Sequence, residues 1–218
     1  MMRRLFEYLK SDYERKTFIF AFVSAFISFA YASYNGVLGI IQKSIWNGSI
    51  CIYYLLLLLI KTILIVERER AFNEKRRKTI IFISFILLII ITSAMFVPAI
   101  LLIKNERAYD LGLIPAIAMA AYTTYSVTNS IINFSKAKYN DNQLVKQIIT
   151  INIVSSLMSI IVLQNTLILA NGELDKGMKT LSICSTFAII SSILILIFIQ
   201  VRKYVQYISQ SNSNERFQ

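Results

Sequence analysis

Six long apolar stretches constrain this chain more than any other feature of its sequence. A helix needs about 20 apolar residues to cross the ~30 Å hydrocarbon layer of a bilayer, because each residue adds about 1.5 Å. The stretches that meet this length cover residues 17–41, 45–66, 79–103, 111–134, 147–170 and 180–201. The sequence therefore predicts an all-α, polytopic membrane protein with six transmembrane helices.

Composition supports a bilayer as the solvent of these stretches. The chain of 218 residues is 56% hydrophobic, with a mean hydropathy of +0.59. In a typical soluble domain about half of the residues are apolar, and the polar residues must cover the surface that faces water. The first stretch is longer than the apolar core of a signal peptide, and no small-residue cleavage pattern follows it, so we expect a retained span.

The distribution of Lys and Arg predicts which side each connection occupies. Seventeen of the 23 basic residues lie in four polar segments, and these alternate along the chain with three segments that hold only five. Short loops rich in Lys and Arg stay cytoplasmic. The four basic segments are residues 1–16, 67–78, 135–146 and 202–218. We therefore expect a cell-membrane protein with an amphipathic N-terminal segment (1–16) and a C-terminal tail (202–218), both cytoplasmic, on either side of a transmembrane domain (17–201).

The net charge of +11 is also explained by the basic segments next to the membrane. Cations next to membrane ends each gain roughly 1 kcal/mol from anionic lipid, so the predicted partner is the bilayer and not nucleic acid. In the N-terminal segment, Leu5, Leu9 and Tyr13 recur at helical spacing among basic residues. This pattern is typical of a helix lying in the membrane interface, although a helix that recognises a protein partner has the same pattern.

Several chemistries lack their usual residues. The chain has no His, and all twelve acidic residues fall in the predicted tails and loops. Proton relays, metal sites and intramembrane proteases use buried carboxylates or His, and Ser without His has no ordinary general base. We therefore expect no cofactor, no metal and no enzymatic activity.

Uncharged polar residues form stripes within three of the predicted spans. Ser24, Ser28, Tyr31 and Asn35 share one face of the first span, because they step by three or four residues. Two more groups lie in the fourth and fifth spans: Tyr122, Thr123, Thr124, Tyr125, Ser126, Thr128, Asn129 and Ser130, and then Asn152, Ser155, Ser156 and Ser159. Such stripes either form hydrogen bonds between helices or line a polar cavity.

Lys61 is the one charged residue inside a predicted span. It lies five residues before the predicted cytoplasmic end, and a lysine stem can reach the headgroups from that depth. We therefore expect Lys61 to snorkel to the interface, and a functional buried charge is the alternative.

A short internal match suggests a duplication. Residues 26–41 align without a gap with residues 117–132, and five positions are identical, among them Tyr31 with Tyr122 and Tyr34 with Tyr125. The match places span one against span four, so each half would hold three helices and the second half would be inverted. Inverted repeats are common in transporters, with the site between the halves. Tyr31 and Tyr34 of the first half are then expected to face Tyr122 and Tyr125 of the second.

Several short pieces carry a resemblance to a known family. They are Ser11-Asp12-Tyr13, Tyr34-Asn35-Gly36 with Gly39-Ile40, Ser44-Ile45-Trp46 with Tyr53-Tyr54, Ala118 to Tyr125, and Leu163-Gln164. Together they resemble an uncharacterised family of small six-span bacterial membrane proteins. The resemblance implies six spans in a bacterial plasma membrane, and it implies no activity or site residues.

Two functional hypotheses follow from these patterns. The first is a small transporter or channel-like protein for a neutral or anionic solute, because the spans hold no acid to balance a cation. Its predicted polar path consists of Tyr31, Asn35, Tyr122, Tyr125, Asn129 and Asn152. The second is a non-transporting membrane subunit that binds a protein partner or forms a homo-oligomer. A cavity near mid-membrane favours the first hypothesis, and a tightly packed bundle favours the second.

Overall fold

The described part of the chain is helical throughout. The computed structural model describes the backbone of residues 2–41, 43–69, 74–104, 113–137, 142–170 and 176–215, and side chains within 22–41, 43–67, 76–100, 117–135, 142–167 and 177–210 apart from 118, 178 and 179. The helices are α1 (Met2–Ile41), α2 (Ile45–Glu69), α3 (Glu74–Ala94), α4 (Phe96–Lys104), α5 (Leu113–Ala137), α6 (Gln143–Ala170) and α7 (Lys176–Glu215). No strand occurs in these residues, which confirms the all-α prediction.

Pro98 explains why α3 and α4 are two helices rather than one. Proline has no backbone N–H, and its ring clashes with the carbonyl four residues earlier, which here belongs to Ala94. The α3 helix ends at Ala94, and α4 begins at Phe96 after a single non-helical residue, Met95. Met95 still connects the two helices, because its N–H donates to the carbonyl of Thr92 in α3 at 3.2 Å and its carbonyl accepts from the N–H of Ala99 in α4 at 3.3 Å.

Local capping sets two of the connections. Lys43 adopts a positive φ of 50°, the left-handed conformation in which helices commonly end. The next residue, Ser44, caps α2, since its Oγ accepts from the backbone N–H of Asn47 at 3.3 Å. Asn142 caps α6 in the same way, through a bond of 3.1 Å from the N–H of Leu144 to Oδ1.

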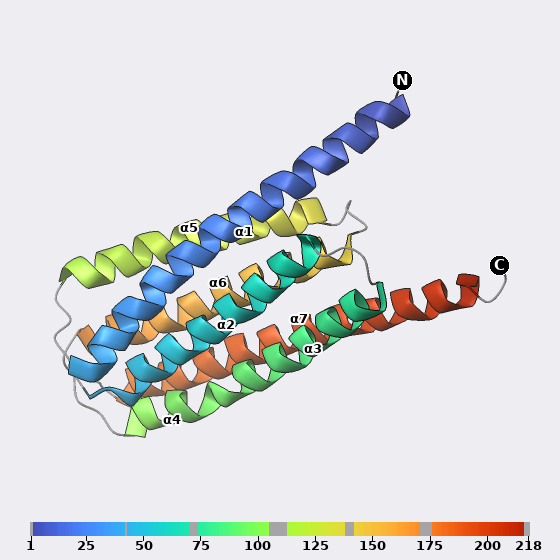
Figure 1. Ribbon diagram of the computed structural model, residues 1–218. Coiled ribbons are helices and arrows are strands. Elements are labelled where there is room, and N and C mark those ends of the chain that lie inside the picture. Colours follow the sequence, from blue (N-terminus) through green and yellow to red (C-terminus); the bar gives the residue numbers. More distant parts are fainter. Residues whose placement is uncertain are drawn as a thin grey trace.

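The six rods lie side by side and alternate in direction (Figure 1). The N-terminal end of α1 and the C-terminal end of α7 lie at the same end of the bundle (Figure 1). Five packings stand out: α1 on α2, α5 on α6, α6 on α7, α3 and α4 on α7, and α2 on α3 and α4. The α6 helix also contacts α1, α2 and α3, so it is the central helix.

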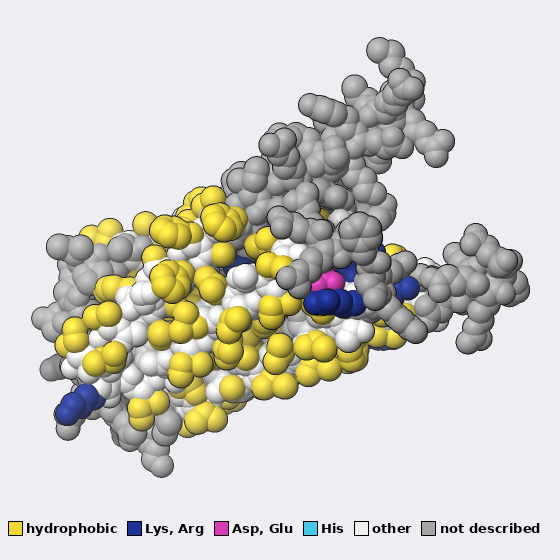
Figure 2. All heavy atoms as spheres, viewed as in Figure 1, with side chains coloured by type: hydrophobic (Ala, Val, Ile, Leu, Met, Phe, Trp, Pro, Cys, Tyr) yellow, Lys and Arg dark blue, Asp and Glu magenta, His cyan; other side chains and the backbone are white. Residues whose placement is uncertain are grey.

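Hydrophobic side chains cover much of the face of the bundle that Figure 2 shows. In the apolar part of α6, 78% of the residues are buried, against 22–39% in the other four candidate spans. The outer helices expose large side chains such as Phe26, Ile90, Ile195 and Phe198. Water-soluble monomers rarely expose contiguous apolar surface of this extent, and the surface fits a bilayer.

Five helices in the described residues are long and apolar enough to cross a membrane. They are Phe22–Ile41, Ile45–Glu67, Arg76–Ile100, Gln143–Leu167 and Thr180–Gln210, and they coincide with five of the six predicted spans. The predicted fourth span, 111–134, falls largely within α5, but residues 111 and 112 and several of its side chains lie outside the described part. A multi-pass membrane architecture is therefore supported, and the predicted fourth span stays a prediction.

Two helices continue beyond the predicted spans. The α1 helix runs without a break from Met2 to Ile41, and α7 runs from Lys176 to Glu215. The N-terminal segment 1–16 therefore continues into the first span as one helix from residue 2 onward, and its location in the membrane interface stays a prediction.

Glycine permits a close contact between the backbones of α1 and α2. A Cβ atom at Gly39 would lie 2.9 Å from the backbone nitrogen of Gly48, closer than real Cβ atoms approach. A Cβ atom at Gly48 would meet nothing within 4 Å. Small residues let helix backbones approach closely within membranes, and here only one of the two glycines is required for the contact.

These two glycines give a matched pair of substitutions. We expect Gly39→Ala to lower the free energy of unfolding by about 1–3 kcal/mol, because the backbones of α1 and α2 must separate. Gly48→Ala should leave it unchanged or raise it by about 0.5–1 kcal/mol, because alanine restricts the unfolded chain and favours a helix. Equilibrium unfolding of the purified protein in mixed detergent micelles measures both. Equal losses in the two variants would contradict the close approach at Gly39.

Candidate functional site

Polar side chains join α5 to α6 in a ladder of hydroxyl groups. Ser126 Oγ and Ser156 Oγ lie 2.9 Å apart, and Ser130 Oγ also lies within hydrogen-bond distance of Ser156 Oγ. Ser130 Oγ donates to the carbonyl of Asn152 at 3.1 Å, one turn before Ser156. One turn further along, Thr123 Oγ1 donates to the carbonyl of Ser159 at 3.4 Å. The contact between these helices is therefore made by small hydroxyl residues, as is common in membranes.

A group of tyrosines lies beside this ladder. The rings of Tyr31 and Tyr122 stack with centroids 4.9 Å apart and an interplanar angle of 22°. Tyr54 meets the edge of Tyr31, also at 4.9 Å, and its hydroxyl donates to the carbonyl of Ser155 at 3.2 Å. The stack links α1 to α5 through side chains, and Tyr54 links α2 to α6. The predicted meeting of Tyr31 with Tyr122 is confirmed.

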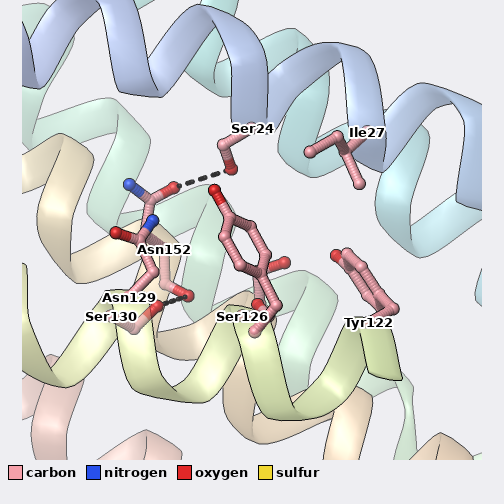
Figure 3. A pocket seen from close by; sticks show the side chains of 9 residues that line it. Ser24, Ile27, Tyr122, Ser126, Asn129, Ser130 and Asn152 are labelled. Atoms are coloured by element: carbon pink, nitrogen blue, oxygen red, sulfur yellow. Dashed lines mark hydrogen bonds between the residues drawn. The ribbon is translucent and has the colours of Figure 1, made fainter. Parts of the chain in front are cut away.

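A small pocket lies between α1, α5 and α6 (Figure 3). It is lined by Ser24, Ile27, Tyr122, Tyr125, Ser126, Asn129, Ser130, Asn152 and Ser155. Figure 3 shows Ser24 and Ile27 approaching from α1, and Asn129 and Ser130 from α5. The cavity volume is about 10 Å³, which is room for a single water molecule. The pocket is therefore small and lined mainly by polar side chains.

Lys61 corrects the prediction of a snorkelling lysine. Its side chain is only 1% exposed, and its Nζ donates to Ser24 Oγ of α1 at 3.2 Å. Lys61 shares the inward face of α2 with Tyr54, Leu57 and Leu64, which step by three, four and three residues along the helix and are all buried. The ammonium group therefore points into the bundle, because this face of the helix packs against α1 and α6.

The ammonium group of Lys61 is connected to the pocket. Ser24 accepts from Lys61 and donates in turn to Asn152 Oδ1 at 3.5 Å, so the chain of contacts runs from α2 through α1 to α6. Ser24 and Asn152 both line the cavity. Among the described side chains the only carboxylate is Glu67, and it lies 3.6 Å from Arg76 Nε. Lys61 is thus buried inside the bundle, and its ammonium group donates to a hydroxyl group.

The predicted path residues are brought together only in part. Tyr122, Tyr125, Asn129 and Asn152 line the one pocket. Tyr31 does not line it, but stacks on Tyr122 from outside. Asn35 is fully buried and its Nδ2 donates to the carbonyl of Tyr31 in its own helix at 2.9 Å, so it is separate from the lining.

The polar residues that sequence reasoning left out of the path are Lys61 and the four lining serines Ser24, Ser126, Ser130 and Ser155. The four serines belong to the predicted stripes, so helical spacing had placed them on the correct faces. The inward direction of Lys61 was harder to predict, because α2 is apolar around it and has few polar residues that mark an inward face. One signal was present: Tyr54 and Lys61 are seven residues apart and therefore share a face.

Comparison with known proteins adds no family. No protein-family model, no curated protein and no solved structure matches the chain. The resemblance to an uncharacterised family of six-span bacterial membrane proteins stays a prediction. Within the described side chains, no three His, Cys, Asp or Glu residues come together as metal ligands.

The serine ladder has a testable contribution to stability. We expect Ser156→Ala to lower the free energy of unfolding by about 0.6–2 kcal/mol, since Ser156 contacts both Ser126 and Ser130 and each interhelical bond contributes on average about 0.6 kcal/mol. The matched control is Ser192→Ala, because Ser192 is exposed and donates only to the Ala188 carbonyl of its own helix. Unfolding in mixed micelles measures both, and a loss in the control as large as that of Ser156→Ala would contradict the ladder.

Proposed function

We propose that this chain is a small transporter or channel-like membrane protein, without enzymatic activity, that admits an anionic or neutral solute between α1, α5 and α6. The observation that carries the proposal is the burial of Lys61 and its link through Ser24 to the wall of the polar pocket. An ion in a membrane interior is costly, and such groups usually mark a pathway for a substrate or ion.

The chemistry of the pocket favours an anion over a cation. A buried ammonium group attracts negative charge, and two charges 4 Å apart gain roughly 4 kcal/mol at an effective dielectric constant of 20. The hydroxyl groups of Ser24 and Ser130 and the amides of Asn129 and Asn152 can donate hydrogen bonds to a solute oxygen. No described residue of the lining is a carboxylate that would bind a cation instead.

The small pocket must widen for a solute to enter, and the packing supports a route. The α1 and α5 helices both contact α6 but make no extended contact with each other. Between them lie the pocket and the stacked pair Tyr31 and Tyr122. Separating α1 from α5 therefore breaks a side-chain stack rather than a close backbone contact, and it would expose the chain from Lys61 to Asn152.

We further propose that the two halves are inverted repeats. Exchanging α1 with α5, α2 with α6, and the α3–α4 rod with α7 leaves the main packing pairs unchanged, because α1 on α2 corresponds to α5 on α6 and α2 on α3–α4 corresponds to α6 on α7. The stacked tyrosines come from matching positions of the two halves. In transporters of this kind the halves rock about a site between them. The basic end, which carries both termini, is proposed to face the cytoplasm.

A second candidate function is a non-transporting membrane subunit. It is favoured by one observation: the pocket at mid-bundle in the described residues has room for one water molecule and no solute. This candidate predicts that the protein copurifies with a partner protein, or associates with copies of itself, and moves no solute when it is alone in liposomes.

A flux assay separates the two candidates. Purified protein in liposomes should pass small monovalent anions, and Lys61→Met should reduce that flux by at least about tenfold, since the charge interaction of roughly 4 kcal/mol is removed. Lys43→Met is the matched control, because Lys43 is exposed in the turn before α2 and should retain the flux. Lys61→Met should fold at least as well as the original protein, since burying an ammonium group costs stability.

The results have distinct meanings. Equal flux of anions through the original protein and Lys61→Met would remove Lys61 from the path. If the folded protein passes none of the tested anions faster than protein-free liposomes do, the result would contradict transport and favour the subunit.

A further inference from the structure

A larger cleft lies away from the pocket, toward the end of the bundle that carries both termini. It is formed by α3, α5, α6 and α7 and has a volume of about 810 Å³. Its position follows from the residues of α7 that line it, which lie between Gln200 and Gln210 at the end of the span Thr180–Gln210. The cleft is therefore at the depth where the hydrocarbon layer meets the headgroups, on the predicted cytoplasmic side.

The cleft has an apolar part and a basic, polar part. Ile81, Phe85, Phe134 and Ile149 supply apolar surface from three helices. Two lysines, Lys146 of α6 and Lys203 of α7, line the same cleft. Around them are the hydrogen-bonding side chains Ser135, Gln143, Gln147, Thr150, Gln200, Tyr204, Gln206, Tyr207 and Gln210. None of the described residues that line it is acidic, so their combined charge is positive.

Two hydrogen bonds fix the inner wall of the cleft. Gln147 is 1% exposed, and its Nε2 donates to Ser84 Oγ of α3 at 2.8 Å. Tyr204 donates from its hydroxyl group to the carbonyl of Lys78 at 2.9 Å and packs on Phe85 with ring centroids 5.8 Å apart. The wall between α3, α6 and α7 is thus held by the protein itself, and the opposite side, between α5 and α7, has no extended helix contact.

We propose that this cleft binds an anionic glycerophospholipid of the surrounding membrane. The phosphate group lies between Lys146 and Lys203, exposed lining side chains such as Gln206 and Tyr207 bind the headgroup, and one acyl chain covers Phe134. A membrane lipid fits better than a dissolved phosphate compound, because the apolar part of the cleft needs an apolar occupant and the gap between α5 and α7 opens sideways. Basic pockets between transmembrane helices are known sites for acidic headgroups.

Binding of short-chain lipids to the full-length protein tests the proposal. The protein is purified in a neutral detergent, and dioctanoyl phosphatidylglycerol, dioctanoyl phosphatidylcholine and glycerol 3-phosphate are titrated separately. We expect phosphatidylglycerol to bind more tightly than phosphatidylcholine. The double variant Lys146→Gln/Lys203→Gln should weaken its binding by about 30-fold, because each lysine near an anionic headgroup contributes roughly fivefold.

A second double variant controls for general surface charge. Lys43→Gln/Arg202→Gln also removes two positive charges, but from exposed positions outside the cleft. This variant should bind phosphatidylglycerol as the original protein does. If the first double variant does not fold, Lys203→Gln alone replaces it, because Lys203 is exposed, and about a fivefold loss is expected.

Three results would overturn the proposal. Equal affinity for phosphatidylglycerol and phosphatidylcholine would show that the cleft does not recognise the net negative charge of the headgroup. Equal losses in the two double variants would show a diffuse effect of surface charge. Glycerol 3-phosphate that binds as tightly as phosphatidylglycerol and competes with it would assign the cleft to a dissolved phosphate compound. The solute path at Lys61 is unaffected by any of these results, because the two sites share no residue.

Discussion

The structure depends on an arrangement of polarity that is inverted relative to a water-soluble protein. The central helix, α6, carries Asn152, Ser155, Ser156 and Ser159, and all four are buried, while the outer helices turn Phe, Ile and Leu outward. In water this arrangement would expose most of the apolar surface, and in a bilayer it exposes none to solvent. Hydrogen bonds from α5 then hold α6, because lipid tails give apolar side chains no reason to prefer a neighbouring helix.

The position of the candidate site follows from this arrangement. The hydroxyl groups and amides that hold α5 against α6 also form the wall of the small pocket, and α1 completes it with Ser24. Structural and functional explanations of the polar stripes are therefore not exclusive here: Ser126 and Ser130 make interhelical bonds and line the cavity. What packing alone does not account for is Lys61. An apolar residue of similar length would fill that place without the cost of burying a charge.

Much of the fold could be predicted from the sequence, because span length and helical spacing are local properties. The burial of the polar stripe in the fifth predicted span followed from the spacing of its residues. Contacts between helices could not be derived in this way. Lys61 was predicted to reach the interface from its depth in the span alone. The rotation of α2 about its own axis decides where the side chain points, and α2 has too few polar residues to show that rotation. Asn35 lies on the predicted stripe, yet it bonds within α1, because a stripe defines a face but not which neighbouring helix meets each part of it.

The central claim is that lipid surrounds the apolar exterior while the polar stripes face inward. Nitroxide spin labels report this directly when they are placed at Ile195 and at Phe198, which are 61% and 60% exposed on α7. Cys51 and Cys184 are first replaced by Ser, and the labelled protein is reconstituted in liposomes. The account predicts that both labels collide with oxygen, which dissolves in the hydrocarbon layer, far more often than with a water-soluble nickel chelate. Frequent collisions with the nickel chelate at both positions would place this surface in water and contradict the account.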